Sequence, residues 1–194
     1  MTAGVRRQII PAIVAFLAFT VLVGLLYPLA ITGIAQVAFP SRADGSLVKQ
    51  DGKVVGSSLI GQDFSGPLYF HPRPSSAGDG YDAMSSSASN LGPSNPELLQ
   101  VVRKRLRLYR AENGLPPSQE VPADAVTGSG SGLDPMISPE NARLQAQRVA
   151  DARGMTLDQV MALVGASTTG RSLGFLGEPG VNVLELNLAL DNQA

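Results

Sequence analysis

The longest apolar run of the chain lies near the N-terminus. No charged residue occurs from Gln8 to Ser41, and most positions of the segment 9–39 are apolar. A bilayer core about 30 Å thick requires roughly 20 apolar residues in helical conformation. The run therefore predicts a single transmembrane helix over residues 9–39, preceded by a tail over residues 1–8 and followed by one domain over residues 40–194.

Two other interpretations of this run stay open. A buried helix of a soluble protein usually has an apolar run of about 10–14 residues, and the core of a cleaved signal peptide has about 7–15. Both are shorter than this run, although Gly33-Ile34-Ala35 resembles a cleavage site. The length of the run therefore favours a membrane anchor.

Shorter patterns predict strands in the domain that follows. Asp51-Gly52 lies between two strand-like runs and predicts a β-hairpin over residues 46–56, because both central residues of a type I′ turn need positive φ. Residues 67–70 form a short apolar strand candidate. Over residues 181–191 leucine alternates with other residues, which predicts a half-buried strand.

Three helices are predicted from the residues at their ends. The first begins at Asn95-Pro96-Glu97 and ends at Gly114. The second begins at Ser138-Pro139-Glu140 and ends at Gly154, and the third begins with the capping box Thr156–Gln159 and continues to Val164. Together these patterns predict an α+β fold, in which a single N-terminal transmembrane helix is followed by one mixed α/β domain.

Two segments rich in turn-forming residues separate these elements. Residues 71–96 are mostly Pro, Ser, Gly, Asn, Asp and Ala; disorder is one interpretation, but Tyr81, Leu91 and the repeated Asn and Ser residues favour an ordered loop. Residues 127–132 are rich in glycine. Leu133-Asp134 follows where a P-loop has Lys and Ser or Thr, so the nucleotide-binding signal is weak.

The distribution of charge predicts an orientation for the transmembrane helix. Arg6, Arg7 and the terminal amine directly precede the apolar run, and positive charge there favours the cytoplasmic side. We therefore expect a cytoplasmic N-terminus and an extracytoplasmic domain. The net charge of the chain is −1, so no broad basic surface is available for nucleic acid.

The composition gives little support for catalysis or metal binding. There is no cysteine and His71 is the only histidine, which argues against a structural zinc site. His71 stands in a His-Pro-Arg-Pro turn, and no Gly-x-Ser-x-Gly sequence is present, which argues against a serine hydrolase triad. No catalytic residue and no metal ligand is predicted.

Two sets of residues suggest contact surfaces. In the apolar run, Thr20 and Gly24 form a small-xxx-small pair close to Pro28, where we expect a kink; this face either accepts another helix or is surrounded by lipid. The helix that starts after Asn95 carries a cluster of basic residues. They predict a solvated face, or alternatively one that binds anionic lipid or phosphate, and comprise Arg103, Lys104, Arg105, Arg107 and Arg110.

Several segments together carry a resemblance to a known family. They are residues 56–62 (GSSLIGQ), 69–75 (YFHPRPS), 89–96 (SNLGPSNP), 129–138 (SGSGLDPMIS), 148–150 with 152–154, and 176–179 with 181–184. With these segments the chain resembles, over nearly its whole length, the C subunit of the Kdp potassium-transporting P-type ATPase. It departs from the usual family pattern at Ser87, Ala88, Met136 and Gly180, which weakens any role for those positions.

The resemblance implies a non-catalytic subunit of a four-part pump in the bacterial inner membrane. The implied partners are a channel-like subunit that selects potassium, the P-type subunit that hydrolyses ATP, a small membrane subunit, and the lipid bilayer. The family is described as a catalytic chaperone that raises the nucleotide affinity of the ATPase subunit. The resemblance implies no covalently bound cofactor. It also implies that the chain contacts ATP only through the complex.

The resemblance also gives residues their expected roles. A motif over residues 85–96 resembles the signature loop of ABC transporters, and Ser89, Asn90 and Gly92 are its nucleotide-binding candidates. Residues expected at subunit contacts are Ser94, Asn95 and Asp134, together with Thr20, Gly24 and Pro28 in the apolar run.

The expected orientation conflicts with direct nucleotide binding, because ATP is scarce outside the cell. Our main hypothesis is therefore that the chain assembles and stabilises the complex. The loops with the motifs SNLGPSNP (residues 89–96) and SGSGLDP (residues 129–135) then either lie at a subunit contact or serve only to define the fold. A nucleotide-binding subunit and a membrane-anchored exported enzyme are the alternatives.

Overall fold

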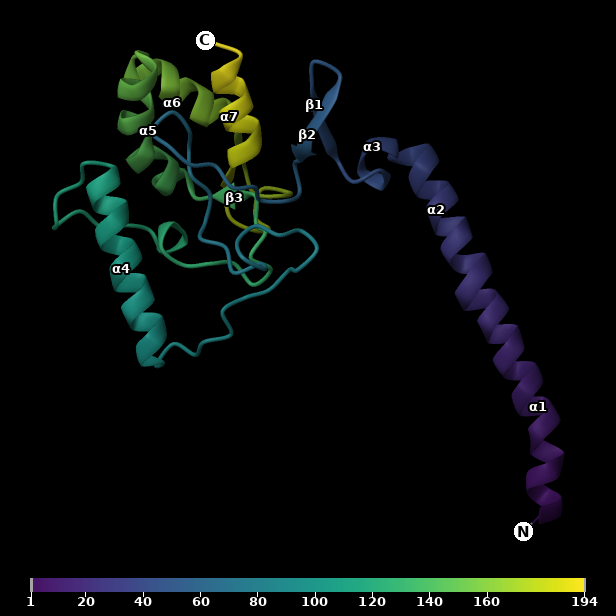
Figure 1. The fold of residues 1–194 in the computed structure, drawn as a ribbon. Coiled ribbons are helices and arrows are strands. Elements are labelled where there is room, and N and C mark those ends of the chain that lie inside the picture. Colours follow the sequence, from purple (N-terminus) through teal and green to yellow (C-terminus); the bar gives the residue numbers. More distant parts are fainter. Residues whose placement is uncertain (1, 194) are drawn as a thin grey trace. The chain divides into compact units, whose positions relative to one another are not determined.

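A continuous helical run opens the chain (Figure 1). The computed structural model describes residues 2–193, and the run consists of α1 (Thr2–Val21), the π-helical turn η1 (Leu22–Leu26) and α2 (Tyr27–Ala38), followed by the short helix α3 (Pro40–Ala43). Residues 7–38 are long and apolar enough to cross a membrane. A first unit of the chain ends at Leu47 and a second begins at Val48. Met1, whose amino group adds to the positive charge before the apolar run, and Ala194 lie outside the described residues.

The hydrogen bonding of this run changes directly before Pro28. Proline has no N–H to donate. The N–H of Tyr27 donates to the carbonyl of Leu22, five residues back, which is the pattern of a π-helical turn. Where a kink is expected, the structure has a widened π-helical turn over residues 22–26, and the helix continues through Pro28 as α2.

A two-stranded hairpin follows the first unit. Its strands are β1 (Leu47–Gln50) and β2 (Lys53–Ser57). Between them Asp51 has a φ of 50° and Gly52 a φ of 76°, as a type I′ turn requires. The predicted hairpin is therefore confirmed.

A second sheet joins segments that are far apart in the sequence. Its strands are β3 (Met136–Ile137), β4 (Thr168–Thr169) and β5 (Gly180–Asn182), and β5 lies between the other two, antiparallel to both. Helices α5 (Pro139–Arg153), α6 (Leu157–Ala166) and α7 (Val183–Asp191) pack against one another beside this sheet (Figure 1). They enclose a mainly aliphatic core that includes Phe70, Ile137, Ala142, Ala146, Val149, Val160, Val164, Val181, Leu186 and Leu190.

The end signals of the predicted helices are confirmed. At the start of α5 the hydroxyl of Ser138 accepts the N–H of Asn141 at 3.1 Å, and Gly154 ends the helix with a φ of 65°. Thr156 and Gln159 form the capping box of α6. Each of these caps joins residues that are close in the sequence, which is why a local pattern identifies them.

The predicted strand over residues 181–191 is wrong, because β5 ends at Asn182 and α7 follows it. The side chain of Asn182 caps α7 by accepting the N–H of Glu185 at 3.2 Å. The alternating leucines include Leu186 and Leu190, which are both fully buried. Residues four apart share one face of a helix as well as one face of a strand, so the cap and the core packing select the helix.

The predicted short strand over residues 67–70 is also wrong, because side chains rather than a strand hold its backbone. The amide of Asn187 in α7 accepts the N–H of Phe70 at 2.9 Å and donates to the carbonyl of Phe70 at 2.9 Å. Arg148 and Arg153 in α5 donate to the preceding carbonyls of the segment at 2.6 to 2.9 Å. The segment therefore forms a turn that leads into the core at Phe70, without belonging to a sheet.

Replacing Asn187 tests this arrangement. In Asn187→Ala both hydrogen bonds to the buried backbone of Phe70 are lost, and each buried polar group left unsatisfied costs about 1–3 kcal/mol. We expect the free energy of unfolding of the full chain in detergent, measured by chemical denaturation, to fall by about 2–5 kcal/mol. The control is Asn192→Ala, an exposed position just after α7. A loss no larger than that of the control would contradict this role for Asn187.

Candidate functional site

The long loop over residues 71–96 contains no helix or strand before Pro96, yet hydrogen bonds hold it in a defined conformation. The hydroxyl of Ser75 accepts the N–H groups of Ala77 at 3.1 Å and Tyr81 at 2.8 Å. The Tyr81 hydroxyl donates to a carbonyl earlier in the loop at 2.7 Å, and Ala77 is fully buried. The prediction of an ordered loop is confirmed.

The glycine-rich loop over residues 127–134 is joined to the long loop by several hydrogen bonds. The Ser75 hydroxyl donates to the carbonyl of Gly132 at 2.7 Å. The carbonyl of Ser131 accepts the N–H of Ser87 at 3.0 Å and the hydroxyl of Ser86 at 2.9 Å. The two loops therefore form one structure, although more than 40 residues separate Ser86 from Ser131 in the sequence.

Gly132 is the point of closest approach between the two loops. Its φ is +69°, and a Cβ there would lie 2.5 Å from the carbonyl oxygen of Ser87 and 2.8 Å from the nitrogen of Ala77. Only glycine fits such a position without displacing backbone. Gly130, in the same loop, has open space around the corresponding position.

Asp134 serves the internal structure of the glycine-rich loop. Its carboxylate accepts a hydrogen bond from Arg73 Nη1 at 3.0 Å and another from the N–H of Met136 at 3.0 Å. Arg73 also donates from Nη2 to the carbonyl of Gly128 at 3.2 Å. This ion pair thus ties the His-Pro-Arg-Pro turn to both ends of the second loop.

Helix α4 (Pro96–Glu112) begins where the long loop ends. The side chain of Asn95 accepts the N–H of Glu97 at 2.8 Å, and the N–H of Asn95 donates to the carbonyl of Gly92 at 3.0 Å. The predicted helix start is confirmed. Asn95 is thereby occupied as the cap of α4.

The predicted solvated basic face of α4 is wrong for two of its residues. Arg105 donates from Nη1 to the carbonyl of Val126 at 3.4 Å, and Arg110 donates from Nη2 to the carbonyl of Gln119 at 2.6 Å; both arginines are half-buried. Burial lowers the pKa of Arg105, an effect that the neighbouring Tyr81 partly opposes. The remaining basic residues are exposed, namely Arg103, Lys104 and Arg107.

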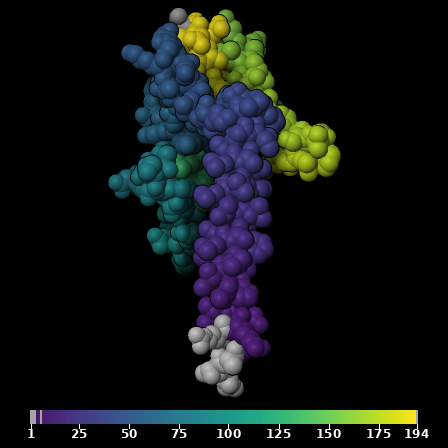
Figure 2. Space-filling model, turned by 90° about the vertical axis from the view of Figure 1, so that its right-hand side faces the viewer, coloured from purple at the N-terminus to yellow at the C-terminus, as the bar shows by residue number. Residues whose placement is uncertain are grey.

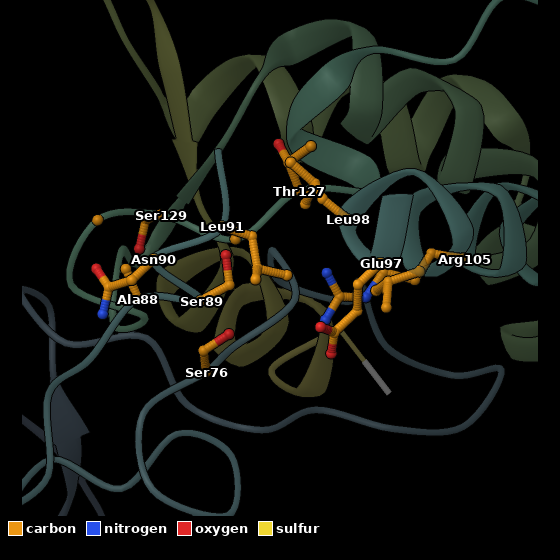
Figure 3. Close-up of a pocket in the computed structure, with 13 residues that line it drawn as sticks. Ser76, Ala88, Ser89, Asn90, Leu91, Glu97, Leu98, Arg105, Thr127 and Ser129 are labelled. Carbon is orange, nitrogen blue, oxygen red and sulfur yellow. The ribbon is translucent and has the colours of Figure 1, made fainter. Parts of the chain in front are cut away.

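A groove of about 630 Å³ lies where α4 meets the two loops (Figure 3). The loop segments 88–91 and 127–130 line it, together with the face of α4 that carries Leu98, Val101 and Arg105. Figure 3 shows Asn90 and Ser129 on one side of this view, with Glu97 and Arg105 on the other. Glu97 and Arg105 are the charged residues of the described lining, so the groove combines hydroxyl and apolar groups with a balanced pair of charges.

The structure brings together some of the residues that the sequence singled out. Ser89 and Asn90 line the groove, and Asn90 has a φ of 54°. Gly92 does not line the groove; its carbonyl accepts from the cap residue of α4, and Ser94 is exposed. The roles expected for these residues stay predictions.

In the first unit the candidate contact residues lie around the π-helical turn. The hydroxyl of Thr20 donates to the carbonyl of Phe16 within the helix at 2.8 Å. Gly24 lies inside the turn and Pro28 lies just after it. The small pair therefore coincides with the irregular part of the helix.

Sequence reasoning missed the contribution of Arg105 and Thr127 to the groove. A usable signal was present for Arg105, because Leu98, Val101 and Arg105 follow the helical spacing i, i+3, i+7 that places residues on one face. Because Arg105 belongs to a run of basic residues, the sequence suggested a solvated position for it instead. For Thr127 no local pattern predicts a neighbour on α4.

His71 is engaged within the domain. Its Nε2 lies 2.8 Å from the carbonyl of Gly66, and its Nδ1 lies 3.2 Å from a carboxylate oxygen of Glu112 near the end of α4. Among residues 2–193 the structure contains no group of three or more His, Cys, Asp or Glu side chains that could hold a metal ion. The groove between the loops, which the predicted residues Ser89 and Asn90 line, is the candidate site of the second unit.

These features define a class of protein. The chain combines a helix able to cross a membrane with a mixed α/β unit whose groove is built by two interlocked loops. A family model described as the K+-transporting ATPase c chain, KdpC, matches residues 9–192. The chain belongs to this family, which confirms the resemblance of its sequence motifs.

Relatives match nearly the whole chain. The potassium-transporting ATPase KdpC subunit of Mycobacterium tuberculosis (strain ATCC 25618 / H37Rv) is 59% identical over 186 residues, which cover 96% of this chain and 98% of the relative. The KdpC subunit of Caulobacter vibrioides (strain NA1000 / CB15N) is 59% identical over 182 residues, covering 93% and 91%. That of Beijerinckia indica subsp. indica is 57% identical over 187 residues, covering 95% and 93%.

Substitution of Gly132 tests the junction of the two loops. Gly132→Ala forces a side chain into the left-handed region and against the Ser87 carbonyl, so we expect a loss of about 1–3 kcal/mol in the free energy of unfolding. Limited proteolysis of the full chain in detergent should also become faster within residues 82–92. The matched control is Gly130→Ala, which meets open space. Equal behaviour of the two variants would show that the loops are not locked at Gly132.

The pKa of Tyr81 provides a pH test of the ordered loop. Burial, followed by the charge of Asp63, raises the pKa of Tyr81 from 10.0 to about 12, and Arg105 acts in the opposite direction. As the pH rises, the unfolded chain loses the proton of the Tyr81 hydroxyl before the folded chain does. The stability that this hydroxyl contributes to the fold is therefore complete below about pH 10 and is lost between about pH 10 and 12. In Tyr81→Phe the fall in unfolding midpoint over this range should be smaller. Identical pH profiles would contradict a buried Tyr81 hydroxyl.

Proposed function

We propose that this chain is the accessory subunit of a potassium-transporting ATPase that assembles and stabilises the complex. In this proposal its N-terminal helix spans the membrane, its second unit lies outside the cytoplasm and holds the channel-like subunit, and this contact supports the ATP-hydrolysing subunit as a chaperone would. Membership of the family supports the association with such a complex. The chain itself has no proposed catalytic step.

The observation that carries this proposal is the hydrogen bonding between the long loop (residues 71–96) and the glycine-rich loop (residues 127–134). The residues that bond to other parts of these loops are Arg73, Ser75, Ser131 and Asp134. Their polar groups are therefore used to fix a shape. A fixed surface with a balanced charge suits protein docking, because an ordered surface loses less conformational entropy on binding.

The charges before the apolar run support this orientation. Arg6 and Arg7 precede it, and the tendency of positive residues to stay inside favours a cytoplasmic N-terminus. The second unit, which begins at Val48, then lies on the other side. Any nucleotide held in the cytoplasm would be out of its reach.

Direct nucleotide binding is the second candidate function. The groove volume lies within the range of ligand sites, about 300–1,000 Å³, and Ser89, Asn90 and Arg105 supply polar groups. The charge of the lining argues against a triphosphate, because Glu97 balances Arg105 and no lysine lines the groove among the described residues. A membrane-anchored exported enzyme is a third candidate, supported by the groove alone.

Single cysteines in intact cells test both orientation and docking, because the native chain has none. Met84 is 95% exposed in the long loop, whereas Ser89 lines the groove. We expect a membrane-impermeant thiol reagent to label Met84→Cys and Ser89→Cys when the chain is expressed alone, and not Thr2→Cys. When the other subunits are co-expressed, labelling of Ser89→Cys should fall and that of Met84→Cys should persist.

The other outcomes favour the alternatives. Labelling of Thr2→Cys alone in intact cells would place the domain in the cytoplasm and make nucleotide binding the leading candidate. Labelling of Ser89→Cys that is unchanged by the other subunits would contradict docking at the groove. In that case the two loops would serve only to define the fold.

A further inference from the structure

A short hairpin between β4 and β5 presents large apolar side chains to solvent. Leu173 is 83% exposed, Phe175 68% and Leu176 50%. Figure 2 shows this part of the chain as the yellow-green lobe that projects from the second unit. Elsewhere in that unit the large exposed apolar side chains are scattered along the sequence, so this cluster stands apart.

Hydrogen bonds hold the hairpin in a defined shape. Ser172 and Leu176 form an antiparallel bridge in which each N–H donates to the other carbonyl at 2.9 Å. At the base, Arg171 and Glu178 form an ion pair of 2.6 Å. The tip of the hairpin therefore has a defined conformation.

The backbone at Leu173 supports a function for the exposed tip. Leu173 has a φ of 55°, in the left-handed region that a branched side chain rarely occupies. Its side chain lies in solvent, so packing within the domain does not compensate for this conformation. Strained backbone of this kind concentrates at functional sites, and contact with a partner would supply the missing packing.

The charge of the hairpin selects among possible partners. Surfaces that bind anionic lipid place unpaired Lys or Arg beside apolar residues, whereas Arg171 is paired with Glu178 here. Leu173, Phe175 and Leu176 then form an uncharged tip. Such a tip complements an uncharged apolar recess in a protein, where a buried aromatic anchor contributes most of the binding energy.

We propose that Leu173, Phe175 and Leu176 form an anchor that inserts into an uncharged apolar recess on another subunit of the potassium-transporting ATPase. This inference rests on the proposed function and assigns a particular surface to it. The anchor is distinct from the groove between the two motif loops, because none of its residues lines that groove.

The test uses the whole complex purified in detergent. In Leu173→Ser combined with Phe175→Ser we expect the affinity of the full chain for the remaining subunits to fall by about 30-fold or more, as for loss of a central anchor. The thermal stability of the free chain should not change, because both side chains are exposed. The control is Leu108→Ser on α4, which removes a side chain that is 59% exposed outside the hairpin.

A photo-crosslinking phenylalanine analogue in place of Phe175 identifies what the tip contacts. A crosslink to another subunit of the complex is the expected result. A crosslink to lipid only, to a second copy of this chain, or to nothing would overturn the inference, as would a double variant that binds as tightly as the control.

Co-purification distinguishes a failure of the proposed function from a failure of the anchor alone. If the unaltered chain did not co-purify with the other subunits, the proposed function itself would fall. If the unaltered chain co-purified and the double variant did so equally well, only the anchor would be rejected.

Discussion

The second unit depends on two buried amide side chains that take the place of a neighbouring strand. Asn187 bonds to both the N–H and the carbonyl of Phe70, and Gln145 bonds in the same way to His71, at 2.7 and 3.0 Å. Both amides are almost fully buried. Buried backbone groups without partners cost about 1–3 kcal/mol each, so the backbone at Phe70 and His71 can enter the core only because α5 and α7 supply these side chains.

This constraint positions the groove. Directly after His71, the chain reaches Arg73 and Ser75, whose side chains bond to the glycine-rich loop. That loop in turn fixes the neighbouring residues Ser86 and Ser87. A series of contacts therefore leads from the helical core to the two loops of the groove, and each step includes a hydrogen bond between a side chain and the backbone.

The sequence predicts this molecule well where the determining residues are neighbours, and poorly where they are distant. Asp51-Gly52 and the cap Ser138 act locally, and both predictions are confirmed. The segment 67–70 has the composition of a strand, but its partner Asn187 lies 117 residues away from Phe70, beyond any local pattern. The segment 181–191 fits two periodicities, and tertiary packing selects the helix.

The same distinction applies to the candidate site. Ser89 and Asn90 were found through the family resemblance of their loop, whereas the place of Arg105 depends on which face of α4 turns inward. Both the groove and the hairpin around Phe175 are fixed in shape before any partner arrives. For a subunit of a complex, such ordered loops require little further ordering on binding, which lowers the entropic cost of a contact. The irregular loops of this domain therefore present polar and apolar side chains on surfaces that internal hydrogen bonds have already ordered.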